Sequence, residues 1–109
     1  MRSTQQNINK SLVGLAIEQA ILDTGGTKMF YEVLNFLYEN YDSYTTDCLV
    51  HPQYLLAALK EQDRKYSSII ISLIMSKLEE YSYHKPIQNF LTKLNMYRWF
   101  FLSKLMPYS

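Results

Sequence analysis

The chain of 109 residues is poor in residues that cross-link or interrupt a fold: it has one cysteine, three glycines and three prolines. A single cysteine excludes an internal disulfide framework and is typical of proteins in a reducing compartment. No stretch approaches about 18 uncharged apolar residues, and the amino terminus lacks the apolar segment of a signal peptide. We therefore expect a cytoplasmic protein with no integral membrane segment.

The composition that remains is that of a globular domain. Hydrophobic residues make up 48% of the sequence and charged residues 19%, and this length is enough for one domain to bury a core without cross-links. We expect a single domain over residues 1–109, frayed at 1–6 and 107–109. Tyrosine is abundant, with ten copies; we interpret these side chains as mostly lying at the edge of the core, where an apolar ring with a polar tip fits.

Apolar residues recur at helical spacing along most of the chain, which predicts an all-α bundle of about five helices. We place these helices at residues 7–23, 28–40, 52–62, 66–81 and 86–105. Gly25 and Gly26 should end the first helix by adopting the left-handed conformation, and His51-Pro52 should open the third. Between the second and third predicted helices, residues 40–48 are polar and rich in turn formers, which predicts a flexible loop.

The fourth predicted helix is the one most enriched in isoleucine, and the bundle should be organised around it. Ile70, Ile74 and Leu78 form a stripe, and other apolar residues extend it to neighbouring faces, so most of this helix should be covered. Asp63 or Ser67 can accept hydrogen bonds from the first free amides and so cap the helix.

No stretch has the spacing that catalysis or cofactor binding requires, and we predict no catalytic, cofactor or metal residue. Cys48 and His51 have C-x-x-H spacing, but a tetrahedral metal site would need further ligands, and a nucleophilic pair would need an orienting group and an oxyanion site. Gly25-Gly26 could open a phosphate-binding loop, but neither a preceding strand nor a Gly-Lys-Ser/Thr sequence completes it. Structural roles are the favoured interpretation of all four residues.

The last predicted helix is long and carries more apolar surface than one side of a monomer can cover. We predict that it pairs with a second copy of the chain, as a homodimer, or with a partner protein, because exposed aromatic residues and methionine are typical of interface centres. A helix lying in the plane of a membrane is the less favoured alternative. The predicted partner-binding residues are Met96, Trp99, Phe100, Phe101 and Leu102.

Basic residues are concentrated in the second half of the chain, where residues 60–109 carry eight basic and four acidic groups, against three and six in residues 1–59. Arg64, Lys65, Lys93 and Arg98 could contact the phosphates of a nucleic acid if the last two helices lie side by side. A pI of about 7.8 is low for such a protein. A nucleic-acid-binding regulator is therefore the alternative function, and a solvated helix face is the simpler interpretation.

The order of these signals also resembles a known family. Leu22-Asp23-Thr24-Gly25-Gly26 closes a first helix, residues 30–37 read FYEVLNFL, residues 51–59 read HPQYLLAAL, and an isoleucine-rich helix follows. Over about residues 12–94 this pattern is similar to a small all-helical archaeal family of predicted signal-transduction output domains named after Nitrososphaera. The family tends to have a glycine before its fourth helix, where this chain has Gln62-Asp63-Arg64-Lys65. The resemblance implies a non-catalytic interaction or output module.

Overall fold

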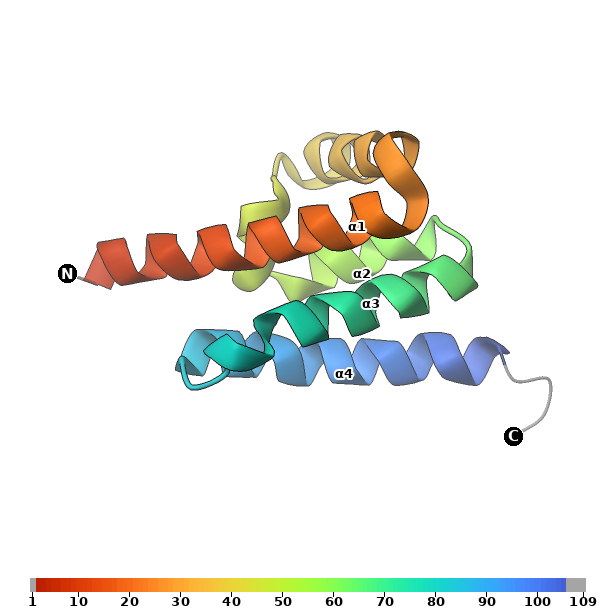
Figure 1. The fold of residues 1–109 in the computed structure, drawn as a ribbon. Coiled ribbons are helices and arrows are strands. Elements are labelled where there is room, and N and C mark those ends of the chain that lie inside the picture. The colour runs from red at the N-terminus through yellow and green to blue at the C-terminus, as the bar shows by residue number, and fades with distance from the viewer. Residues whose placement is uncertain (1, 106–109) are drawn as a thin grey trace.

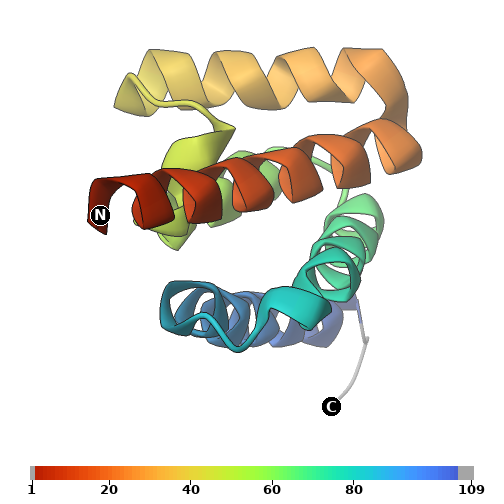
Figure 2. The same ribbon diagram turned by 60° about the vertical axis from the view of Figure 1, so that its left-hand side comes forward.

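The chain begins with one long helix that reverses its direction near the middle. The computed structural model describes residues 2–105, with side chains described for residues 4–99 and for Phe101. Helix α1 (Arg2–Tyr41) is interrupted at Gly26, whose φ of 74° and ψ of −168° are not helical. The two segments of α1, residues 2–25 and 27–41, therefore fold back on each other as a helical hairpin (Figures 1 and 2).

The second segment of α1 ends in an αL cap. Asp42 has a positive φ of 51°, its amide donates to the carbonyl of Tyr38 at 2.9 Å, and the amide of Ser43 donates to that of Leu37 at 3.3 Å. These bonds satisfy carbonyls that the end of a helix leaves free. The residue in the left-handed conformation is an aspartate, and aspartate is one of the few residues other than glycine that tolerate this conformation.

Residues 40–48, where we expected a loop, are only partly irregular: residues 42–44 are non-helical, and a short 3₁₀ helix, η1 (Thr45–Leu49), follows them. Thr45, Cys48 and Leu49 are buried in it. The hydroxyl of Thr45 donates to the carboxylate of Glu18 in α1 at 3.0 Å. Gly14 allows α1 to come this close, because a Cβ at that position would lie 2.7 Å from the Cγ2 of Thr46.

The remaining elements follow in short succession: α2 (Pro52–Lys60), α3 (Arg64–Leu78), the 3₁₀ turn η2 (Glu79–Tyr81) and α4 (Lys85–Leu105). Pro52 stands at the start of α2, as predicted. The carboxylate of Asp63 caps α3 by accepting from the amide of Lys65 at 2.8 Å. Ser67, the other predicted cap, instead donates to the carbonyl of Leu59 at 2.7 Å and ties α2 to α3.

Helix α3 lies between the first segment of α1 and α4 (Figure 1), which is the central place predicted for it. Its fully buried side chains include Ile70, Ile71, Ile74 and Leu78, whereas Ile69 is 43% exposed. The cover is therefore less complete than the isoleucine content suggested. The radius of gyration is 13.4 Å, close to the value of about 13 Å expected for a compact chain of about 100 residues.

The all-helical, compact architecture is confirmed over residues 2–105, but the count of five separate helices is not. Four α-helices are present in this part of the chain when α1 is counted as one element, and the two segments of α1 on either side of the kink at Gly26 correspond to the first two predicted helices. Helix α1 also begins at Arg2, so residues 2–6, where fraying was expected, are helical. Met1 and residues 107–109 lie outside the described residues.

Candidate interaction surface

Helix α4 has two different faces, and the inner face belongs to the core. Pro86 is compatible with the first turn because it needs no amide partner there. Phe90, Leu94 and Phe101 recur along one stripe, and each is 1% exposed or less. These residues hold α4 against α3 and thereby determine which side chains point outward.

The outer face of α4 changes from polar to apolar along its length. Gln88, Thr92 and Asn95 are exposed in the earlier turns, and Met96 and Trp99 follow with 61% and 65% of their surface exposed. Residues three positions apart are neighbours on a helix surface. Met96 and Trp99 therefore form a small apolar patch, which we call the α4 patch.

The structure divides the predicted partner-binding residues of α4. Met96 and Trp99 are available to a partner, whereas Phe101 is buried in the core and is not. Phe101 lies on the core stripe with Phe90 and Leu94, so it is not accessible as a partner contact in the free chain, contrary to the prediction. The side chains of Phe100 and Leu102 lie outside the described residues.

The predicted basic residues lie on two helices and point in different directions. Arg64 and Lys65 are exposed in the first turn of α3, and Lys93 is exposed on α4. Lys93 and Arg98 are five residues apart, so their side chains leave the helix roughly 140° apart. The Nε of Arg98 is buried and has no hydrogen-bond partner in the described part of the chain. These residues are not aligned along one face of α4.

Cys48 and His51 have packing roles in the fold: the thiol is buried and the imidazole ring stacks on a tyrosine. The thiol of Cys48 is fully buried, and burial together with the charge of Asp47 raises its pKa to about 12. Such a thiol stays protonated at neutral pH, which is the opposite of a reactive cysteine. The ring of His51 stacks on Tyr54 at 4.6 Å, and Tyr54 stacks on Tyr41 at 4.0 Å. These stacked rings join the end of α1 to the start of α2.

The tyrosines are divided between the core edge and the open surface. Tyr41, Tyr54, Tyr81 and Tyr97 are partly buried beside the core, as we interpreted them. The others for which exposure is described are Tyr31, Tyr38, Tyr44, Tyr66 and Tyr83, and these are 43% to 77% exposed. The interpretation as core-edge residues is therefore correct for only part of the set.

A second apolar surface lies on the first segment of α1, where sequence reasoning had not placed one. Ile8, Leu15 and Leu22 are 49%, 53% and 42% exposed, and Leu12 is partly buried between them. The core face of this segment is formed by other residues, namely Val13, Ala16, Ile17, Ala20 and Ile21. Both sets were visible in the sequence, but periodicity alone does not tell which of two apolar faces meets the core.

The described part of the chain also lacks the features of two other classes of site. Within residues 2–105, no group of three or more His, Cys, Asp or Glu side chains is arranged to hold a metal ion. No helix in this range combines the length and apolar character needed to cross a bilayer. Comparisons of the chain with protein-family models, with curated proteins and with solved structures found no match.

Proposed function

We propose that this chain is a non-catalytic helical interaction module that acts through the α4 patch, by binding a second copy of itself or a partner protein. The observation that carries the proposal is the 65% exposure of Trp99 beside the 61% exposure of Met96. Tryptophan, the largest apolar side chain, is highly buried on average. An exposed tryptophan beside an adaptable methionine is typical of the centre of a protein interface.

The signalling part of the proposal depends on the family resemblance over about residues 12–94. That resemblance supports a place among archaeal-type signal-transduction output domains, in which association with another protein transmits the signal. The packing of α4 on α3 supports the same role, because a helix that is already folded and held by buried Phe90, Leu94 and Phe101 does not have to be ordered when a partner binds.

The proposal is tested by measuring association with and without Trp99. Trp99 is the only tryptophan in the chain, so its fluorescence reports on this patch alone. We expect its emission to shift to shorter wavelengths as the protein concentration rises, because association removes the indole from water. Trp99→Ser should lower the mass measured by light scattering relative to wild type. Tyr83→Ser is the matched control, since Tyr83 is 77% exposed but lies before α4.

Two outcomes contradict the self-association form of the proposal. One is an emission spectrum and a mass that do not change with concentration, and the other is a Trp99→Ser protein with the mass of wild type. Binding to DNA or RNA that falls steeply with added salt would instead support the nucleic-acid alternative, in which Arg64, Lys65, Lys93 and Arg98 contact phosphates.

A further inference from the structure

The exposed apolar residues of α1 follow the spacing of a coiled-coil seam. Ile8, Leu12, Leu15, Gln19 and Leu22 are separated by four, three, four and three residues, which is the alternation of a and d positions in a heptad repeat. Gln19 is exposed on this face as well. The core residues of the same segment lie on the opposite side of the helix. This part of α1 is therefore apolar on two sides, and only one side is covered.

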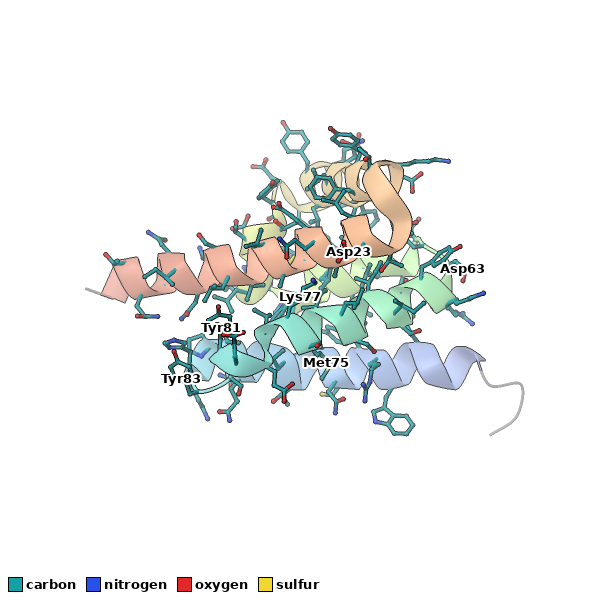
Figure 3. All side chains as sticks on the ribbon, viewed as in Figure 1. Asp23, Asp63, Met75, Lys77, Tyr81 and Tyr83 are labelled. Carbon is teal, nitrogen blue, oxygen red and sulfur yellow. The ribbon has the colours of Figure 1, made fainter. Side chains whose placement is uncertain are left out.

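The seam continues into a groove formed with the end of α3. A hollow of about 330 Å³ lies between the two elements. Its α1 side includes Leu12, Leu15 and Gln19, and its other side is formed by the end of α3 and by η2, including Tyr81. The Nζ of Lys77 in α3 and the Oδ2 of Asp23 in α1 lie 3.5 Å apart at one end of this region. Figure 3 shows these two side chains directed toward each other, with Tyr81 beyond the end of α3, in η2. Because the hollow adjoins the seam, side chains of a helix that packs on the seam could enter it.

We propose that this seam pairs α1 of one chain with α1 of a second copy, in antiparallel orientation. The same heptad positions on both helices make the seam self-complementary, as a two-fold interface requires. The helix is already folded within the domain, so pairing does not have to supply the cost of helix formation that limits short isolated coiled coils.

The charges beside the seam determine the orientation. With Leu12 at an a position, Glu18 is a g residue and Asp23 is the following e residue. A parallel pair would bring Glu18 of each helix against Asp23 of the other, which places like charges together twice. An antiparallel pair with Leu12 opposite Leu15 brings Glu18 near Ser11, which is neutral, and no longer places Glu18 against Asp23. Ile8 then faces Gln19 across the seam.

This inference concerns a surface separate from the α4 patch and is tested in a background that lacks it. We expect Trp99→Ser to be a dimer in light scattering, and Leu15→Gln/Trp99→Ser to be a monomer with an unchanged circular dichroism spectrum. Leu15 is 53% exposed, so its replacement should not disturb the core. Tyr38→Ser/Trp99→Ser, changed at an exposed position in the second segment of α1, is the matched control and should stay dimeric.

Orientation is tested by oxidative cross-linking with single cysteines. A mixture of Ile8→Cys and Gln19→Cys proteins should form a disulfide between the two variants, and neither variant alone should cross-link efficiently. Native Cys48 is fully buried and does not compete. Three results overturn the inference: a monomeric Trp99→Ser protein, a Leu15→Gln/Trp99→Ser protein that stays dimeric, or variants that cross-link only to themselves. A Trp99→Ser protein with the wild-type mass contradicts self-association through α4 and leaves the α1 dimer standing.

Discussion

Gly26 is the residue on which the reversal of α1 depends. Its φ of 74° and ψ of −168° fall in a region that is essentially restricted to glycine, and the sequence prediction of an ordinary left-handed cap was therefore only partly right. Asparagine tolerates the left-handed helical region but not this one. The backbone, and not packing, is the constraint here, since a Cβ at this position would have no neighbour within 4 Å.

We predict that Gly26→Ala and Gly26→Asn lower the free energy of unfolding by similar amounts, about 1–3 kcal/mol. Urea denaturation monitored by circular dichroism measures the loss, with Thr27→Ala as the neighbouring control. An asparagine variant as stable as wild type would show that Gly26 adopts the ordinary left-handed conformation instead.

The elements of the fold differ in how far the sequence revealed them. Helices α2, α3 and α4 were predictable because each repeats apolar residues at helical spacing and begins at a recognisable residue, such as Pro52 or Asp63. Element η1 was not, because its five residues are too few to show a period. Thr45 and Cys48 are buried by contact with α1, and the bond from Thr45 to Glu18 spans 27 positions. Local residue preference contains no information on such a contact.

The same limit applies to the two candidate surfaces. The excess of apolar residues near the carboxyl end predicted the α4 patch, and Met96 and Trp99 are exposed as that prediction requires. The seam of α1 was missed because its leucines were indistinguishable from core leucines in the sequence. Only the packing of the rest of the fold, which buries Val13, Ala16, Ile17, Ala20 and Ile21, separates the two sets.

Element η1 provides a second prediction, through the close approach at Gly14. In Gly14→Ala the new methyl group would lie 2.7 Å from the Cγ2 of Thr46, and overpacking of this kind costs about 1–3 kcal/mol. Part of this cost should appear as easier opening of η1. We expect the buried thiol of Cys48 to react with a thiol reagent about tenfold faster or more, since about 1.4 kcal/mol changes an equilibrium tenfold.

The control for Gly14→Ala is Ser11→Ala, which changes an exposed residue one turn earlier on the same helix. It should label at the wild-type rate. Equal labelling of the two variants would mean that η1 does not rest on α1 at Gly14. The measurement belongs at neutral pH, because burial raises the pKa of Cys48 to about 12 and keeps the native thiol protonated and slow to react.

At the scale of the whole molecule, the two surfaces lie on different helices of the fold. The α4 patch lies on the helix that flanks α3 on one side, and the seam lies on α1, which flanks α3 on the other (Figure 1). An α1 dimer would thus carry two α4 patches, one from each chain, and a partner with two binding sites would be held more tightly than by one patch alone.

Dimerisation through α1 also predicts a stability that depends on protein concentration. A protein that unfolds from a dimer to separate chains is stabilised by mass action, because only the folded form associates. For Trp99→Ser above its dissociation constant, each tenfold rise in concentration should add about 0.7 kcal/mol per chain and raise Tm by about 3–5 °C. In Leu15→Gln/Trp99→Ser the Tm should be independent of concentration, because the seam no longer pairs. Thermal unfolding followed by circular dichroism over two decades of concentration would measure both, and a Tm of Trp99→Ser that does not change would mean that folding and α1 pairing are not coupled.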